Sequence, residues 1–252
     1  MQKIAVDLHI HSLLSPCAGN DMTPPRVLER AVKKGLDLIA ITDHNSALNV
    51  PAFCRAAEDF PLEVVPGMEI QTREDVHLIC LFATVEKVFR LQEVVDKTLP
   101  RVHNREEYFG EQLVVDEKGR VVGVERRLLL NSLDLSIEEA VAEVVKLGGA
   151  CIAAHVDRQA FSLLGILGFV PAELPLAALE VSRREAAAEL YRRYGGPAGY
   201  PLIFSSDAHY LADVGRNITM MPPVVNSAAS LLGFLKGGCG DKSRFFAENH
   251  HN

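Results

Sequence analysis

Short, nearly continuous apolar segments alternate with segments of helical character along most of this chain. A strand buried on both faces shows such an uninterrupted apolar run, whereas a strand with one solvent-exposed face alternates apolar and polar residues. Parallel strands also require long crossover connections, and the intervening helical segments supply them. The alternation therefore predicts an α/β fold made of parallel β/α units.

The predicted elements follow one another in regular order. Thr23 is a suitable N-cap before Pro24, and Ser136 and Glu139 form a capping box, so both positions are predicted helix starts. Strands are predicted at 3–11, 36–42, 62–66, 76–83, 150–154, 177–181 and 202–205, and helices at 23–35, 49–59, 85–97 and 136–147.

The segment from about 100 to 132 departs from this order. Residues 112–115 and 121–125 are strand-like and flank a polar turn that contains Asp116 and Gly119, which is typical of a β-hairpin. No linker, repeat or low-complexity tract divides the sequence. We therefore expect a single domain over residues 1–252, with the hairpin inserted as a flap at about 100–132.

Composition restricts the classes of partner. The 252 residues carry a formal net charge of −7 and show no basic cluster, which predicts no membrane partner and disfavours nucleic acid. The amino terminus has no long apolar region and no apolar run reaches about 18 residues, so we expect a cytoplasmic protein. The cysteines are odd in number and scattered, which is typical of reduced thiols.

Side chains that bind metal ions recur where the predicted strands end. Ligands of parallel β/α proteins bind outside the carboxyl ends of the strands, and residues two apart on a strand share a face. His77 is the exception, because it stands near the start of its strand. The other members of this set are His9, His11, Asp43, His44, Glu69, His155, Asp207 and His209.

A single histidine at a strand end is more often a hydrogen-bonded structural residue than a ligand, but the recurrence changes this interpretation. Burying so many ionisable groups without a counter-charge would cost several kcal/mol each. Divalent cations supply that charge, and mixed imidazole and carboxylate ligands suit zinc, manganese or iron. Among the histidines, only His103, His250 and His251 fall outside the set.

Six stretches in this chain resemble the PHP (polymerase and histidinol phosphatase) family, in the order of that family: DLHIHS, ITDHN, PGMEI, VHLIC, AAHVDR and SSDAHY. The resemblance covers residues 3–210 and implies a distorted (β/α)7, TIM-like barrel with two or three metal ions. It implies that His9, His11, Glu69 and Asp207 hold the first ion. Glu69 would bridge to a second ion held by His77 and His155, and His44 and His209 would hold the third.

The predicted function is hydrolysis of a small phosphoester, such as a nucleotide, a sugar phosphate or a histidinol-phosphate-like molecule. Two close metal ions activate a bridging hydroxide as the nucleophile and neutralise phosphoryl oxygens. The predicted catalytic residues are Glu69, Asp207 and His209. Arg158 and Arg183 follow strand ends, where a guanidinium can bind phosphate in bidentate fashion.

Other reaction classes remain open. Amidohydrolase-type barrels also begin with an HxH pair, but they commonly bridge the metals with a lysine, and Glu69 fills that role here. A non-catalytic regulatory PHP domain would have eroded ligands, whereas nearly all are present. The chain contains no G-x-S-x-G sequence, so a nucleophilic serine enzyme is not indicated.

The third metal site departs from the family pattern. Relatives commonly place Asp or His five or six residues after the HxH pair, where this chain has Pro16 and Cys17. Cys17 and Asp21 are the available substitutes. We favour Asp21, because a carboxylate needs no thiol deprotonation and the turn at Gly19 and Asn20 could fold it back.

Overall fold

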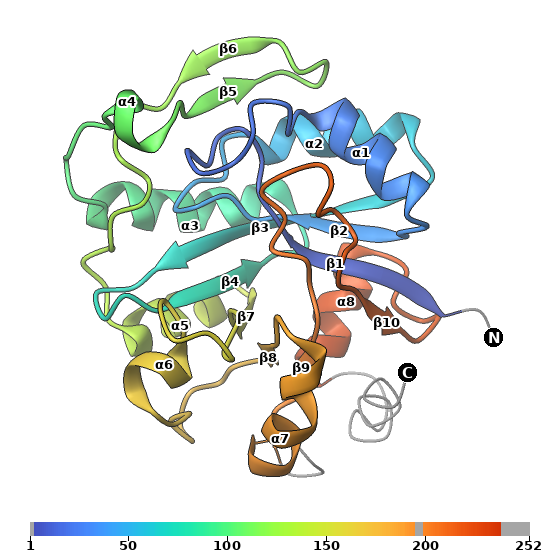
Figure 1. The fold of residues 1–252 in the computed structure, drawn as a ribbon, viewed down its shortest axis with the longest axis vertical. Helices are drawn as coiled ribbons and strands as arrows, with labels where there is room; N and C mark the ends of the chain where they lie inside the picture. The colour runs from blue at the N-terminus through green and yellow to red at the C-terminus, as the bar shows by residue number, and fades with distance from the viewer. Residues whose placement is uncertain (1–2, 195–198, 238–252) are drawn as a thin grey trace.

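A central sheet of eight strands forms a distorted, nearly closed barrel in the computed structural model, which describes residues 3–194 and 199–237 (Figure 1). Cys239, His250 and His251 lie outside the described residues. In spatial order the strands are β10 (Thr219–Met221), β1 (Ile4–Ile10), β2 (Leu38–Ile41), β3 (Glu63–Gln71), β4 (His77–Leu81), β7 (Ala150–Ala153), β8 (Ala178–Glu180) and β9 (Leu202–Ile203).

Side-chain and backbone contacts connect the two edges of the sheet. The backbone N–H of Phe204, just after β9, donates to Thr219 Oγ1 of β10 at 2.7 Å, and that hydroxyl donates back to Phe204 O at 2.8 Å. Further along, Ala208 forms a parallel bridge with Ile10 at the end of β1. These contacts bring the segment after β9 to the carboxyl end of β1, and the predicted distorted barrel is confirmed.

Strand direction differs from the all-parallel expectation at two places. Strands β1, β2 and β3 are mutually parallel, as are β7, β8 and β9, but β4 is antiparallel to both β3 and β7, and β10 is antiparallel to β1. The short connection from β3 to β4 allows only an antiparallel pair. Because β4 is reversed, its first residue, His77, pairs with Gln71 at the carboxyl end of β3. The start of this strand therefore belongs to the same edge as the other ligands.

Helices cover the sheet on both sides, which explains its nearly continuous apolar strands. One buried cluster joins the sheet to the helices that follow its strands. A second joins alternate strand residues such as Val6, Leu38 and Ile79 to Leu231 and Phe234 of the last helix. The helices are α1 (Pro24–Lys33), α2 (Val50–Ala56, followed by a 3-10 turn at Ala57–Asp59), α3 (Val85–Thr98), α4 (Glu106–Phe109), α5 (Ile137–Lys146), α6 (Leu163–Leu167), α7 (Arg184–Tyr194) and α8 (Ala228–Leu235).

Both predicted helix starts are confirmed. Thr23 is the N-cap of α1 with proline directly after it, although its side chain makes no capping hydrogen bond. Ser136 and Glu139 form the expected capping box at α5. None of the helices in the described part of the chain is long and apolar enough to cross a lipid bilayer.

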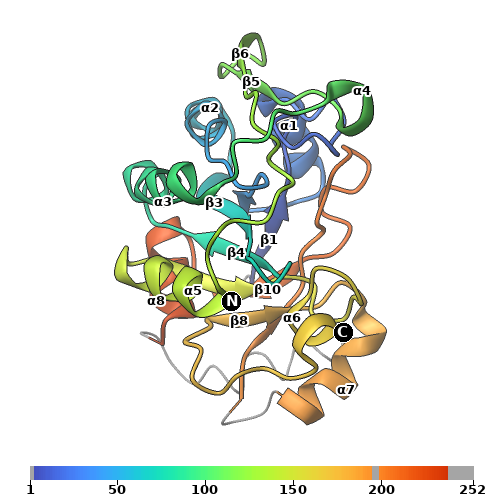
Figure 2. The same cartoon turned by 90° about the vertical axis from the view of Figure 1, so that its left-hand side faces the viewer.

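The predicted hairpin is present as β5 (Leu113–Val115) and β6 (Val121–Val124), a separate two-stranded sheet. It lies over α1 and α2, at the end of the molecule opposite α7 (Figures 1 and 2). Asn49 fixes it to the barrel, because its side-chain amide donates to Leu113 O and accepts from Val115 N–H, at 3.0 and 2.9 Å. These two hydrogen bonds connect β5 of the hairpin to the start of α2.

Candidate metal centre

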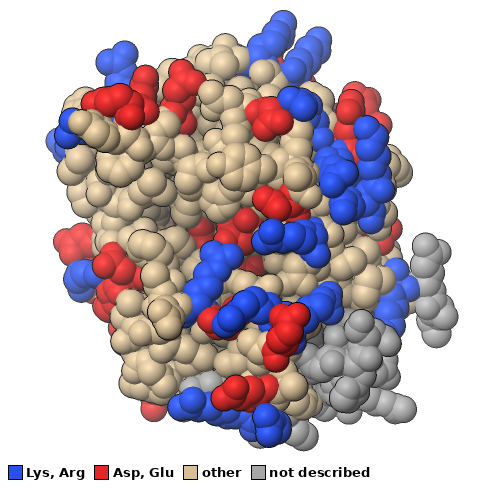
Figure 3. Space-filling model, viewed as in Figure 1, with Lys and Arg blue, Asp and Glu red and all other residues tan. Residues whose placement is uncertain are grey.

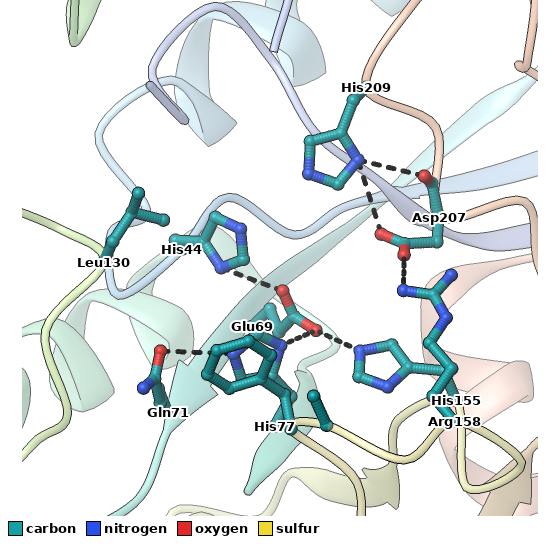
Figure 4. A pocket seen from close by; sticks show the side chains of 11 residues that line it. His44, Glu69, Gln71, His77, Leu130, His155, Arg158, Asp207 and His209 are labelled. Carbon is teal, nitrogen blue, oxygen red and sulfur yellow. Dashed lines mark hydrogen bonds and ion pairs between the residues drawn. The ribbon is translucent and has the colours of Figure 1, made fainter. Parts of the chain in front are cut away.

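The centre of the site is Glu69, a buried carboxylate near the end of β3 (Figure 4). Its oxygens lie 2.9 to 3.5 Å from ring nitrogens of five histidines that come from different strands and loops: His9, His11, His44, His77 and His155. Among the described residues, however, neither oxygen of Glu69 has a hydrogen-bond partner. Buried carboxylate oxygens that face imidazoles at this distance without accepting hydrogen bonds fit ligands of a shared cation.

Donor atoms of four side chains lie at the spacing of one coordination sphere. His9 Nε2 and His11 Nε2 are 3.1 Å apart, and each lies 3.3 Å from Asp207 Oδ1. Glu69 Oε1 lies 3.3 Å from His9 Nε2, and Glu69 Oε2 lies 3.5 Å from His11 Nε2. Donor atoms at about 2.0–2.1 Å from one zinc ion in a tetrahedron are about 3.3 Å apart. The residues present therefore fit the first ion that the sequence predicts.

Hydrogen bonds at the outer nitrogens orient these two rings. His9 Nδ1–H donates to Glu180, with its oxygens at 3.0 and 3.2 Å. His11 Nδ1–H donates to Ser15 Oγ at 2.9 Å, and that hydroxyl donates to Asp43 at 2.7 Å. Each ring therefore directs its Nε2 at the centre, which is how partners of metal-bound histidines commonly orient the ring.

Glu180 and Ser15 were absent from the residues predicted from sequence. Glu180 is the last residue of β8 and is buried, in an otherwise apolar strand. A lone acidic residue in an apolar strand is a signal that sequence reasoning could have used. Ser15 carries no such signal, because serine is common in loops.

Gln71 binds the Nε2 nitrogen of His77, whereas the partners of His9 and His11 bind Nδ1. His77 Nε2–H donates to Gln71 Oε1 at 3.2 Å, which leaves the Nδ1 lone pair directed at Glu69 Oε1, 3.0 Å away. His155 approaches the same oxygen with Nε2 at 3.4 Å. Glu69 Oε1, His77 and His155 therefore form a second donor set that shares Glu69 with the first.

Two of the proposed ligands occupy strained backbone conformations. His155 has φ 31° and Asp207 has φ 50°, both in the left-handed region that costs a residue with a side chain about 1–3 kcal/mol. Backbone hydrogen bonds to buried acids hold both turns, since His155 N–H donates to Glu180 and Ser206 N–H donates to Asp7. Asp7 therefore supports the turn that carries Asp207.

The charges inside the cluster are unevenly distributed. Burial disfavours the charged form of His9, but Glu180, Asp207 and Glu69 raise its pKa well above the usual value. Burial opposes ionisation of Glu69 too, yet His77 and His9 hold its pKa well below the usual range. Burial and the nearby His209 and His44 lower the pKa of His11, which keeps its Nε2 lone pair available.

A third donor group lies beside the first two and consists of His11, His44 and His209. His209 Nδ1–H donates to the backbone carbonyl of Asp207 at 3.0 Å, and its ring stacks on His11 at 4.1 Å between centroids. The structure does not bring Asp21 to this group. Its side chain is 43% exposed and pairs with Arg26 at 3.3 Å, because the chain turns outward before α1.

A cavity of about 360 Å³ opens onto the donor groups. Arg158 lines it and lies 2.6 Å from Asp207 Oδ2 (Figure 4). Phe161 stacks on His77 at 4.9 Å, and Leu130 of the inserted segment forms part of the wall. Arg183 is not among the lining residues. Its side chain is 67% exposed and donates to Asp157 at 3.1 Å, so Asp157 pairs with Arg183 and not with Arg158.

Comparison with known proteins agrees with this arrangement. The model of the PHP domain family matches residues 7–194. The chain belongs to the PHP domain family. A phosphoribosyl 1,2-cyclic phosphate 1,2-diphosphodiesterase from Eggerthella lenta is 33% identical over 129 residues, which is 49% of this chain and 47% of that protein. The chain spans about half the length of the curated relatives it matches.

Two solved structures of endonuclease Q share the fold. One, a lesion-specific endonuclease from Pyrococcus furiosus, superposes with a TM-score of 0.67 at 20% identity over 95% of this chain and 57% of that chain. The other, with a TM-score of 0.65 at 19% identity over 95% of this chain and 58% of that chain, is a complex with a 27-mer duplex containing an abasic lesion at the active site.

The expectation that nucleic acid is a disfavoured partner is therefore wrong. One of the two structures that share this fold is a complex of endonuclease Q with a duplex substrate. Net charge is a poor guide here because it averages over the whole surface. On the face shown in Figure 3, basic side chains lie among acidic ones and flank acidic groups near the centre. A local positive region can bind an anionic strand on a chain whose total charge is negative.

Proposed function

We propose that this chain is a metal-dependent phosphoesterase that binds two or three divalent ions at the Glu69 cluster. The observation that carries the proposal is the set of buried donor atoms around Glu69, whose oxygens lie 2.9 to 3.5 Å from ring nitrogens without accepting hydrogen bonds. His9, His11, Glu69 and Asp207 would hold the first ion. Glu69, His77 and His155 would hold the second, with His44 and His209 at the third.

The ions would activate a water molecule near neutral pH and neutralise phosphoryl oxygens, which are the functions of paired metals in phosphoester hydrolysis. The chain itself contributes orientation. Glu180 and Gln71 bind the outer nitrogens of His9 and His77, so the nitrogens that would hold the ions are already directed at the cluster. Zinc, manganese or iron suits this mixture of imidazole and carboxylate donors.

Arg158 is the proposed phosphate ligand of the chain. Its guanidinium lies 2.6 Å from Asp207, at the boundary between the donor groups and the cavity. When a cation neutralises Asp207, this guanidinium is free to form two parallel hydrogen bonds to phosphate oxygens. Its side chain is 41% exposed, so it can reach a substrate from the open side of the cavity.

The cavity sets the size of the group that enters. A volume of about 360 Å³ is at the low end for small-molecule sites and fits one nucleotide or sugar phosphate. Leu130, Ala160 and Phe161 supply an apolar wall for the body of that group. The Eggerthella lenta relative, named for a cyclic ribose phosphate, supports a phosphodiester of this size as one substrate to be assayed.

The test is an assay of metal-reconstituted protein against a panel of phosphoesters. The panel contains a cyclic ribose phosphate, a nucleoside monophosphate, a nucleoside bisphosphate, histidinol phosphate and an abasic 27-mer duplex. We expect metal-dependent phosphate release or strand cleavage with at least one member, and none in His155→Ala. An absence of hydrolysis across the panel in protein that holds its metals, together with turnover of an amide substrate, would overturn the proposal.

A further inference from the structure

We infer that Phe161 is a stacking platform for a nucleobase, so that the phosphoester bound at the proposed metal centre is a nucleotide rather than a sugar phosphate. The inference rests on the proposed function and narrows its substrate class. It also predicts weak discrimination among the bases. The observations behind it are the exposure of this ring at the cavity, its strained backbone and the loop that carries it.

Phe161 is an aromatic residue that lines the cavity without being buried, since its side chain belongs to a residue that is 44% exposed. One face of the ring is stacked on the imidazole of His77, with 4.9 Å between the ring centroids and 22° between the ring planes. Because His77 covers that face, the opposite face is the one left for a ligand. An exposed aromatic face in a ligand cavity suits stacking by a flat group with a π-system.

The backbone at Phe161 has an unfavourable conformation. Its φ is 57°, in the left-handed region that a residue with a bulky side chain adopts only at a cost in free energy. The carbonyl of Phe161 accepts the backbone N–H of His77 at 3.0 Å, which fixes this conformation against the first residue of β4. Glycine or asparagine would relieve the strain, so a phenylalanine here points to a use for the ring.

One loop carries three of the groups that a bound nucleotide would meet. His155, Arg158 and Phe161 are spaced three residues apart, and all of them line the cavity. Arg158 N–H donates to His155 O at 2.9 Å, and Ser162 Oγ donates to Arg158 O at 2.5 Å, so the loop is closed by its own hydrogen bonds. A phosphate at Arg158 and a base at Phe161 would therefore be held by a single braced segment.

Leu130 supplies an apolar wall on the other side of the cavity. In Figure 4 it lies on the side opposite Arg158. Asn45, which is buried, donates from its side-chain amide to the carbonyls of Leu129 and Asn131, both at 2.8 Å, and so holds the inserted segment on each side of Leu130. A fixed apolar residue at this position complements the apolar faces of a base.

The cavity offers little that could recognise the edge of a base. Gln71 is the one amide among the described residues that line it. Its oxygen accepts from His77, and its NH₂ group donates to Asp75 and Ser132 at 3.0 and 2.9 Å. The other polar lining residues are Arg158 and members of the donor groups. We therefore expect purines to bind more tightly than pyrimidines through their larger stacked area, with little discrimination within each class.

Tryptophan fluorescence tests the stacking directly, because the chain contains no tryptophan. Phe161→Trp places a single indole at the proposed platform. The zinc-loaded variant is titrated with phosphonate analogues of adenosine 5′-monophosphate and of ribose 5-phosphate, in which carbon replaces the ester oxygen and prevents hydrolysis. We expect saturable quenching by the adenosine analogue and none by the ribose analogue. Phe169→Trp, at an exposed phenylalanine that does not line the cavity, is the matched control and should be quenched by neither.

Calorimetric titration of the unchanged, zinc-loaded protein with the same two analogues measures the preference without a new side chain. The adenosine analogue should bind about 5–150-fold more tightly than the ribose analogue, the range for one base stacked on an aromatic side chain. Phe161→Leu keeps an apolar side chain but no ring, so it should bind the two analogues with similar affinity. Phe161→Tyr keeps the ring and should keep the preference.

Equal affinities of the unchanged protein for the two analogues, or a preference that persists in Phe161→Leu, overturns the stacking platform. Binding of the adenosine analogue to Phe161→Trp without quenching overturns it too. If the unchanged, zinc-loaded protein binds neither analogue, the proposed phosphoester site is overturned as well, so the two failures are distinguishable.

Discussion

Glu180 lies directly behind His9: it accepts the Nδ1 proton of His9 at 3.0 Å, while Nε2 of the same ring lies 3.3 Å from Glu69 and from Asp207. The same carboxylate accepts the backbone N–H of His155 at 2.9 Å. One buried acid thus positions ligands of both the first and the second proposed ion. Its contribution to metal binding should be large although no ion touches it.

Glu180→Gln should weaken metal affinity by about 10–100-fold, the range for a residue that orients a metal-bound histidine. Glutamine is nearly isosteric but carries no charge, and its amide cannot accept from both His9 Nδ1–H and His155 N–H as well as the carboxylate does. Competition with a chromogenic chelator measures the affinity. Glu189→Gln, an exposed glutamate on α7, is the matched control. Equal affinities in the two variants would remove Glu180 from the metal centre.

Arg158 and Arg183 offer a paired test, because both follow strand ends but only Arg158 lines the cavity. Arg158→Ala should raise KM by about 10–100-fold, which corresponds to the roughly 1.5–3 kcal/mol of charged hydrogen bonds to phosphate. Arg183→Ala should leave the kinetic constants unchanged, since its guanidinium is occupied with Asp157 at the surface. Steady-state kinetics on the best substrate of the panel decide this, and a larger effect in Arg183→Ala would reverse the assignment.

Metal affinity should increase with pH. Burial opposes the charged form of His44, but Glu69 and Cys17 raise its pKa to about 10, so the metal-free protein carries a proton there at neutral pH. This proton stabilises the metal-free fold fully below about pH 6.5, and the stabilisation is lost as pH rises through about 10. An arriving cation must displace it, so affinity should rise up to about tenfold per pH unit for each displaced proton below that pKa.

Calorimetric titration with zinc in buffers of different ionisation enthalpy counts the displaced protons. We expect net proton release at pH 7 and less release in His44→Gln. His103→Gln, in the inserted segment, should behave like the unchanged protein, because His103 lies on the exposed hairpin side. Binding that takes up protons, or an affinity that is independent of pH, would contradict the charge distribution described for the cluster.

Local patterns were sufficient to predict the β/α units and the six histidines that lie together in the cluster, and the resemblance to the PHP family implied the barrel. The local patterns were insufficient to predict the direction of β4, because an apolar run does not show whether its strand lies parallel or antiparallel to its neighbours in the sheet. That reversal explains why His77 alone stood at the start of its strand. Partners such as Glu180 depend on contacts between residues 171 positions apart, which no local pattern contains.

The third donor group shows the same limit at shorter range. Asp21 and Cys17 are both close to the HxH pair in sequence, and donor chemistry alone favoured the carboxylate. In the structure Asp21 pairs with Arg26, and Cys17 is exposed.

Glu69→Gln should remove most of the stabilisation of the fold by metal. At a free metal concentration about 1,000 times the dissociation constant, binding adds about 4 kcal/mol to the free energy of unfolding. For a domain of this size that corresponds to a rise of about 8–16 °C in Tm. The variant loses the one carboxylate shared by the first and second donor sets, so most of this rise should disappear.

Thermal unfolding with and without zinc measures the effect, and Glu93→Gln on the exposed side of α3 is the control that should keep the full rise. The metal-free Tm should fall as well, because the buried charge that faces His9, His44 and His77 is lost, so the zinc-induced rise is compared within each variant. Removing the charge also removes the largest cause that raises the pKa of His44 and a smaller cause of the raised pKa of His9, so fewer protons remain in the metal-free cluster. A zinc-induced rise in Tm as large in Glu69→Gln as in Glu93→Gln would mean that the ions bind without the bridging carboxylate.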